Sequence, residues 1–91
     1  MSCFTYIIES IKNQSWYYGH SDDPVRRLYE HNVGQNKSTK SKGPWQLIFL
    51  REFGSKQEAN RFELLLKKYR NKGYILKEYG QYFITRKSFG A

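Results

Sequence analysis

The chain has 91 residues, which suffices for one domain with a modest hydrophobic core. Its formal net charge is +8, from 16 Lys and Arg against 8 Asp and Glu, so a polyanion is the expected partner and nucleic acid the commonest one. No apolar run, basic amphipathic helix or signal peptide points to a membrane. The single cysteine, Cys3, excludes an internal disulfide, and a zinc-type Cys/His spacing is absent, so we expect a cytoplasmic location and no membrane partner.

A β-hairpin is predicted at the start of the chain. Residues Cys3 to Glu9 are mostly β-branched or aromatic, which predicts a strand, and Trp16 to Gly19 predicts a second strand after a polar turn. Tyr6 and Tyr17 then lie on facing strands, where cross-strand neighbours can meet. Tyr18 alternates to the opposite face of the hairpin and is expected in the core.

A short helix is predicted to begin at Pro24, after an aspartate that can cap it, and to end before Gly34. Arg27 and His31 are four residues apart and therefore share one face of this helix. Residues 34–44 then form a polar, basic loop of a length that is usually functional or disordered. Three apolar helix residues are expected to face the core: Val25, Leu28 and Tyr29.

A third strand and a long helix are predicted in the second half of the chain. Residues Trp45 to Phe53 have apolar side chains in successive positions, which favours a central strand covered on both faces. Ser55 and Glu58 form a capping box, and apolar residues at helical spacing follow to about Asn71. Gly73 is expected to end this helix.

These elements predict an α+β fold, a three-stranded antiparallel sheet flanked by helices in the order β-β-α-β-α. From Tyr74 onward the periodicity leaves a short helix and a final strand both open. We expect a single domain over residues 1–91, with its core at about residues 4–75 and a tail at residues 76–91 whose structure is left open.

Several side chains in this arrangement suit a site that handles phosphate and protons. Tyr6 and Tyr17 carry phenols that can position or deprotonate a water molecule if a nearby cation lowers their pKa. Arg27 presents a planar fork of donors that matches two phosphate oxygens, and His31 can shuttle protons. Each residue alone is equally explained as a packing tyrosine or a solvated helix residue. Their combination on one hairpin and the helix behind it favours a site.

One carboxylate on the long helix could add a metal ion to this site. Glu63 lies at the edge of the apolar stripe, and Mg²⁺ often takes only one or two protein carboxylates besides water and substrate phosphate. The alternative is a surface ion pair with Lys67 at i+4, which stabilises a helix by about 0.3–0.5 kcal/mol. The sequence pattern allows both.

In the strands the chain resembles the GIY-YIG nuclease domain family. The segment Phe4-Thr5-Tyr6 stands at the family's first block and keeps only the last residue of Gly-Ile-Tyr. The segment Tyr17-Tyr18-Gly19 stands at the second block, with Tyr in place of Ile. The order and spacing of the blocks fit over about residues 4–75, which is similar to small stand-alone bacterial members and to the N-terminal nuclease domain of the UvrC excinuclease subunit.

The helices carry the rest of the resemblance. Arg27-Leu28 fits the first helix of the family, and His31 falls where many members have His. The pattern Ala59-x-x-x-Glu63-x-x-Leu66-Lys67 fits the helix that binds the metal. Asn71 is the candidate for an asparagine that the family carries late in the domain.

The resemblance implies metal-dependent hydrolysis of DNA phosphodiester bonds. Tyr6 or Tyr17 would act on the attacking water as a base or through a relay, and His31 would assist the proton transfer. Arg27 would stabilise charge on the scissile phosphate, and Glu63 would hold one divalent ion, Mg²⁺ or Mn²⁺. Basic residues of the loop and the long helix would hold the DNA backbone: Lys37, Lys40, Lys42, Lys67, Lys68 and Arg70.

Three functions fit the sequence. The first is a DNA endonuclease on structured or damaged duplex, possible roles being repair and recombination, with a protein partner or DNA shape supplying specificity. The second is a non-catalytic nucleic-acid-binding module on the same scaffold, because charge and aromatic content support it equally. The third is a protein-interaction domain with incidental charge. A monomer or a weak homo-oligomer is compatible with all three.

Overall fold

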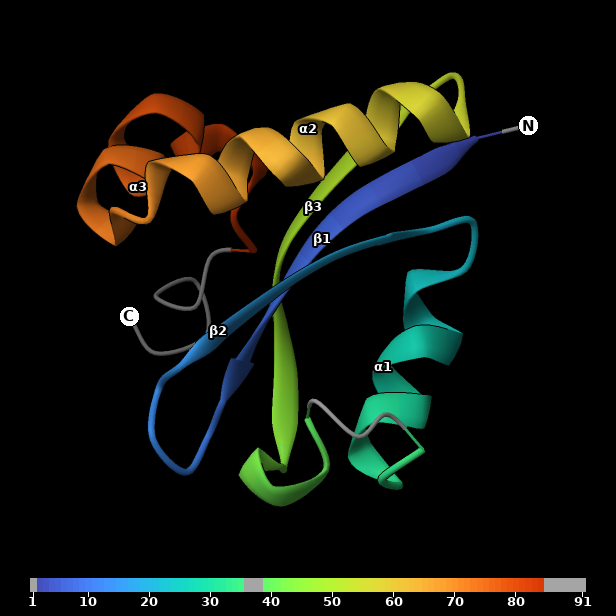
Figure 1. The fold of residues 1–91 in the computed structure, drawn as a ribbon, viewed down its shortest axis with the longest axis vertical. Helices are drawn as coiled ribbons and strands as arrows, with labels where there is room; N and C mark the ends of the chain where they lie inside the picture. The colour runs from blue at the N-terminus through green and yellow to red at the C-terminus, as the bar shows by residue number, and fades with distance from the viewer. Residues whose placement is uncertain (1, 36–38, 85–91) are drawn as a thin grey trace.

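A computed structural model describes residues 2–35 and 39–84 (Figure 1). The sheet has the order β2-β1-β3, and both strand pairs are antiparallel. The predicted α+β class and element order are confirmed, and a third helix and two 3₁₀ turns are added. The elements are β1 (Cys3–Ser10), β2 (Trp16–Ser21), α1 (Pro24–Asn32), η1 (Lys40–Lys42), β3 (Trp45–Phe53), α2 (Lys56–Tyr69), α3 (Lys72–Tyr79) and η2 (Gly80–Tyr82).

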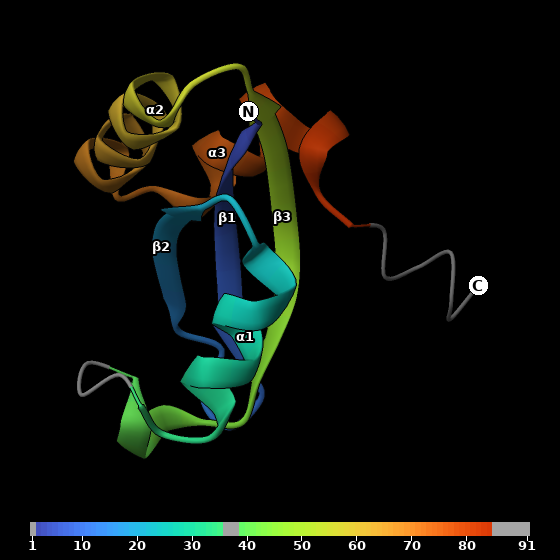
Figure 2. The same cartoon turned by 90° about the vertical axis from the view of Figure 1, so that its right-hand side faces the viewer.

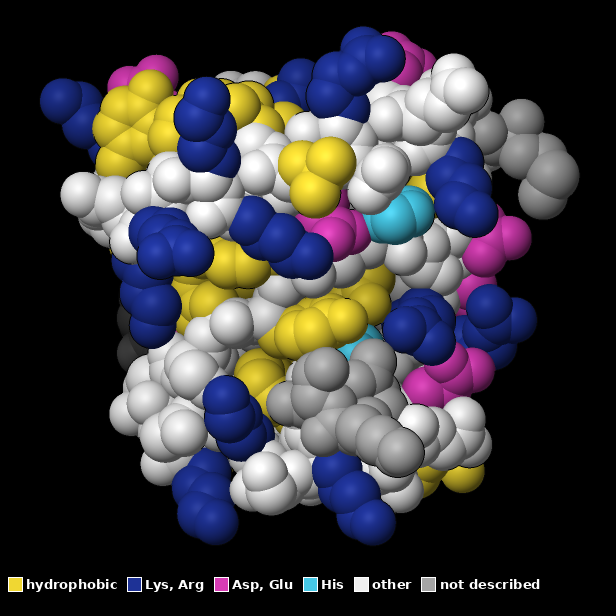
Figure 3. Space-filling view, in the orientation of Figure 1, with side chains coloured by type: hydrophobic (Ala, Val, Ile, Leu, Met, Phe, Trp, Pro, Cys, Tyr) yellow, Lys and Arg dark blue, Asp and Glu magenta, His cyan; other side chains and the backbone are white. Residues whose placement is uncertain are grey.

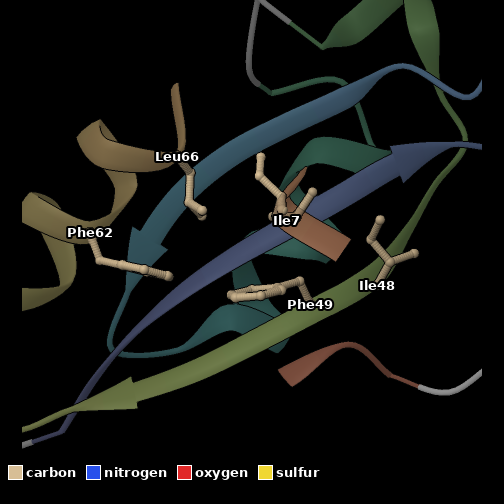
Figure 4. Packing of buried hydrophobic residues seen from close by; sticks show 6 residues of the cluster. Ile7, Ile48, Phe49, Phe62 and Leu66 are labelled. Carbon is tan, nitrogen blue, oxygen red and sulfur yellow. The ribbon is translucent and has the colours of Figure 1, made fainter. Parts of the chain in front are cut away.

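Helices cover both faces of the sheet (Figures 1 and 2). Helices α2 and α3 pack on one face, where Phe62 and Leu66 of α2 meet Ile7 of β1 and Phe49 of β3 (Figure 4). Tyr18 packs against this cluster, as predicted. The second face carries a smaller cluster under α1, built on three buried residues of β1 and β3: Tyr6, Ile8 and Trp45.

The third strand is an edge strand, so the prediction of a central position is wrong. Its apolar run has two other causes. Both faces of β3 are covered, and a register shift between Ile7 and Ile8 on β1 leaves Ile48 without a strand partner, as in a β-bulge. The outer edge of β3 is partly closed, because the Ile84 amide donates to the Ile48 carbonyl at 2.8 Å and Phe49 pairs with Phe83.

Helix α1 presents a different face to the sheet than the sequence predicts. Asp23 caps it by accepting from the Arg26 amide, and Pro24 occupies its first turn, as expected. However, Val25 and Tyr29 are 72% and 64% exposed. Leu28 packs against the cluster under α1, as predicted, and the two buried residues of the helix, Pro24 and His31, lie one turn before it and one turn after it.

The long helix ends earlier than predicted. The capping box forms, since the Ser55 hydroxyl accepts from the Glu58 amide at 3.2 Å. Helix α2 stops at Tyr69, because Arg70 adopts a left-handed conformation with φ 53°. Asn71 then caps α3, so Gly73 lies inside the first turn of α3 instead of ending α2. Among the described helices, none has the length and apolar character needed to cross a bilayer.

Candidate active site

The sheet register places the two tyrosines of the hairpin on one face. Tyr6 lies opposite Gly19, and Tyr17 lies opposite Ile8, so the tyrosines are diagonal neighbours on facing strands. A Cβ atom at Gly19 would stand 2.5 Å from the Tyr6 Oη and 2.6 Å from its Cζ. Gly19 is therefore the residue that lets the Tyr6 ring lie across β2.

A buried chain of polar atoms connects Tyr6 to the basic loop. The Tyr6 hydroxyl is 3.1 Å from His31 Nε2, and His31 Nδ1 is 2.8 Å from the Thr39 hydroxyl. The carbonyl of Thr39 accepts from the indole N–H of Trp45 at 3.0 Å. The ring of Tyr17 lies over His31 with 4.8 Å between centroids. Helix α1 thus holds the imidazole between both tyrosines.

The protonation states of Tyr6 and His31 follow from their surroundings. Burial raises the pKa of Tyr6 and outweighs the neighbouring Arg27 guanidinium, which lowers it, so the phenol is protonated at neutral pH. Burial and the positive charge of Arg27 lower the pKa of His31, so the imidazole is neutral. The phenol then donates to Nε2, and the imidazole hydrogen lies on Nδ1, facing Thr39.

Arg27 is a partly exposed neighbour of Tyr6 and His31. Its pKa is raised, chiefly by hydrogen bonding to Tyr6, and its Nη1 donates to Glu30 at 2.7 Å. The guanidinium also reaches a hollow of about 460 Å³ beside the ends of β2 and α2. Seven residues line this hollow: Ser2, Cys3, His20, Ser21, Asp22, Arg27 and Lys56. A phosphate group placed there would meet the guanidinium and a lysine.

Glu63 stands across β2 from the tyrosines. It approaches from α2, on the face opposite to α1, and its charge is close enough to raise the pKa of Tyr6. The side chain is not open to solvent, because Glu63 is only 7% exposed. Its Oε2 accepts from Lys67 at 2.6 Å, so the alternative ion pair is present, and its Oε1 lies 2.6 Å from His20 Nδ1.

His20 was missed by the sequence reasoning. It pairs with Thr5, whose hydroxyl donates to the Ala59 carbonyl of α2, so both residues face α2. Strand alternation is the signal that could have found it, since His20 shares a face with Tyr18, for which the core is predicted, once the strand continues past Gly19. A residue 43 positions before Glu63 gives no local indication of this contact.

The Glu63 carboxylate fits a divalent ion only if its contact with His20 or with Lys67 rearranges when the ion binds. In the parts of the chain that the structure describes, no group of three or more His, Cys, Asp and Glu could hold an ion. A closed, all-protein site is therefore not the arrangement found there. A single hard carboxylate such as Glu63 suits an ion that keeps most of its waters and also binds substrate oxygens.

The basic residues expected to hold DNA lie in different surroundings. Lys40 and Lys42 are exposed on η1, whereas Lys67 is engaged with Glu63. Lys68 lines a second, apolar hollow with Phe62, Leu65 and Tyr79, and Arg70 is the exposed cap of α2. Lys37 lies outside the described residues. In Figure 3, Lys and Arg side chains surround a band of hydrophobic and histidine side chains on one face of the molecule.

Comparison with known proteins decides the family. The family model of the GIY-YIG catalytic domain matches residues 2–77. The chain belongs to the GIY-YIG family. This family is one of endonucleases that act on DNA and are generally metal-dependent. The first block of the GIY-YIG motif is reduced here to Tyr6, and Asn71, the candidate for the late asparagine, serves as the cap of α3.

Bacterial UPF0213 proteins are similar to this chain. The UPF0213 protein BH0048 of Halalkalibacterium halodurans is 40% identical over 68 residues, covering 74% of this chain and 71% of the relative. UPF0213 protein YazA of Bacillus subtilis is 39% identical over 66 residues, covering 71% and 66%. The solution NMR structure of BH0048 from Bacillus halodurans aligns with TM-score 0.53 and 33% identity, over 89% of this chain and 85% of that one.

Proposed function

We propose that this protein is a metal-dependent endonuclease that hydrolyses phosphodiester bonds of DNA. The observation that carries the proposal is the buried hydrogen bond between Tyr6 and a neutral His31, directly beside the Arg27 guanidinium. A phenol next to an imidazole that can accept its proton is the arrangement needed to activate a water molecule. A guanidinium beside it is the group that stabilises charge on a phosphate.

The proposed proton path starts at the attacking water. As the water oxygen bonds to phosphorus, its proton passes to the Tyr6 oxygen while the phenol proton moves to His31 Nε2. The P–O bond to the leaving oxygen breaks in the same step, and that oxygen takes up a proton from solvent. The lowered pKa of His31 leaves the imidazole neutral at the start, so Nε2 has a lone pair that can accept the phenol proton. The hydrogen on Nδ1 remains directed at Thr39, which keeps the ring oriented. The Tyr17 ring packs against the imidazole, with 4.8 Å between the two ring centroids.

Glu63 is proposed to hold the divalent ion, Mg²⁺ or Mn²⁺. When bound, the ion supplies a Lewis acid for the phosphate oxygens and the leaving group. Arg27 and Lys56, at the hollow, would orient the scissile phosphate. Exposed lysines of η1 would hold neighbouring phosphates. A role in repair or recombination, a protein partner that supplies specificity, and a cytoplasmic location stay predictions.

The test is a cleavage assay on linear, nicked, flap and four-way DNA with Mg²⁺ or Mn²⁺. Glu63→Gln and Arg27→Ala should each reduce the rate by about 10²-fold or more. Glu78→Gln is the control for the carboxylate, because Glu78 is exposed on α3. Arg26→Ala is the control for the guanidinium, because Arg26 directly precedes Arg27 in the chain and also pairs with Glu30. Cleavage that survives Glu63→Gln would contradict this mechanism.

A non-catalytic DNA-binding module is the second candidate, and one observation favours it. Both carboxylate oxygens of Glu63 already have partners, His20 and Lys67, so an ion must displace or rearrange one of them. If the protein is such a module, it binds DNA and cleaves none of the four substrates. The second candidate also predicts that Glu63→Gln binds DNA as the wild type does.

A further inference from the structure

The contact between His20 and Glu63 is a place where a second metal ligand could stand. His20 Nδ1 lies 2.6 Å from Glu63 Oε1, and the carboxylate can only accept, so Nδ1 carries the hydrogen. The His20 side chain is 22% exposed and lines the hollow that Arg27 also reaches. The carboxylate lies directly behind the imidazole and is nearly buried.

We propose that His20 is a protein ligand of the ion at Glu63, and that this site takes a first-row transition ion such as Mn²⁺ in preference to Mg²⁺. The inference rests on the proposed function, because it concerns the ion that Glu63 holds there. It goes further by naming the second ligand and the class of metal.

The distances support adjacent ligands on one ion. Two ligands at right angles, each about 2.1 Å from a metal, are about 3.0 Å apart. The His20 Nδ1 and Glu63 Oε1 atoms therefore need to separate by a few tenths of an ångström, and the imidazole ring must turn so that Nδ1 faces the metal instead of Oε1. When the metal binds, the hydrogen on Nδ1 leaves, and the neutral imidazole ligand carries its one hydrogen on Nε2. Lys67 keeps its contact with Oε2 throughout.

The chemistry of the donors sets the metal preference. A lone carboxylate with waters is an all-oxygen site, which suits Mg²⁺. An imidazole nitrogen adds little for Mg²⁺, more for Mn²⁺, and still more for Co²⁺ and Ni²⁺, in the order in which divalent first-row ions bind nitrogen ligands. The positive charge of Lys67 reduces the charge that the carboxylate can offer a hard ion. Both features favour an ion that gains from the nitrogen.

The test is electron spin echo spectroscopy of Mn²⁺ added alone to the wild-type protein, since the method detects a nitrogen bound to the metal. We expect a ¹⁴N signal that is absent in His20→Gln and retained in His31→Gln, the matched change at the other histidine. Titrations should show that His20→Gln weakens Mn²⁺ binding by about tenfold or more and Mg²⁺ binding less. The wild-type spectrum needs no variant to fold.

Two results would overturn the inference in distinguishable ways. Mn²⁺ that is lost in Glu63→Gln but shows no ¹⁴N signal in the wild type would remove His20 as a ligand and leave the metal role of Glu63 intact. Mn²⁺ that binds Glu63→Gln as it binds the wild type would remove the metal site of the proposed function as well.

Discussion

At the scale of single residues, the position of the Tyr6 phenol depends on Gly19 having no side chain. Gly19 lies opposite Tyr6 in the sheet, and the ring occupies the space that a Cβ at Gly19 would need. The same phenol donates to a buried histidine, so its position and its chemistry are linked. A glycine in a strand often marks such a close approach.

We predict that Gly19→Ala displaces Tyr6 from His31. The added methyl group would stand 2.5 Å from the Tyr6 Oη, and this atom is held by the buried imidazole. Overpacking of this kind lowers the free energy of unfolding by about 1–3 kcal/mol. Urea denaturation measures the loss, and NMR of the His31 ring measures the displacement. Gly80→Ala is the control, because nothing lies within 4 Å of a Cβ there. An unchanged His31 spectrum in Gly19→Ala would contradict the prediction.

We predict that stability falls as the pH drops below the ordinary pKa of histidine. Burial and the charge of Arg27 lower the pKa of folded His31 below 6.5, so the unfolded chain binds this proton first. The contribution of His31 to the free energy of unfolding is therefore complete above pH 6.5 and is lost as the pH falls through the folded pKa. Urea denaturation from about pH 5 to pH 8 should show this slope.

The variant His31→Gln separates this effect from other titrations. Its free energy of unfolding should lack the part of the slope that His31 contributes, while any slope from carboxylates persists. Equal slopes in the variant and the wild type would show that the imidazole is not held neutral. NMR titration of the His31 ring in the wild type gives its pKa directly.

At the scale of elements, local signals placed the helix starts correctly and the helix face incorrectly. Asp23 and Ser55 cap α1 and α2 as their residue types predict, because a cap is a contact within four residues. Val25 and Tyr29 look like core residues by hydrophobicity, yet they lie on the outer face of α1. That face is chosen by how α1 docks on the sheet through Leu28.

We predict that Ser55→Ala lowers the free energy of unfolding by about 1 kcal/mol, because the Glu58 amide loses its acceptor. Ser55→Gly should lower it by only a few tenths of a kcal/mol, since glycine is itself a tolerated cap. Urea denaturation of both variants makes the comparison. Wild-type stability in Ser55→Ala would show that the capping box contributes nothing.

At the scale of the whole molecule, the charge of +8 is spread over a small surface. Basic side chains surround the band in Figure 3 that contains histidine and hydrophobic groups. The positive electrostatic potential of these side chains attracts a polyanion from a distance, and this attraction weakens as salt is added. The charge thus supports DNA binding by both candidate functions and does not separate them.

We predict that DNA affinity falls steeply with salt. If about 6 phosphates are contacted, the slope of log K against log salt concentration is about −5 for duplex DNA. Fluorescence anisotropy with labelled DNA measures it. Lys40→Gln should reduce the slope by about 1, because Lys40 is exposed on η1, whereas Lys77→Gln on α3 should leave it unchanged. A flat salt response would favour the protein-interaction domain.

The sequence by itself determined the order of strands and helices, their caps, and the residue types of the candidate site. Those features depend on neighbours within a few positions. The tertiary structure decided that Gly19 faces Tyr6, that Thr39 holds the imidazole of His31, and that His20 reaches Glu63. These pairings depend on strand register and on helix docking, where a shift of one residue exchanges the two faces of a strand. Contacts across the fold carry no local signal, so only the packed chain reveals them.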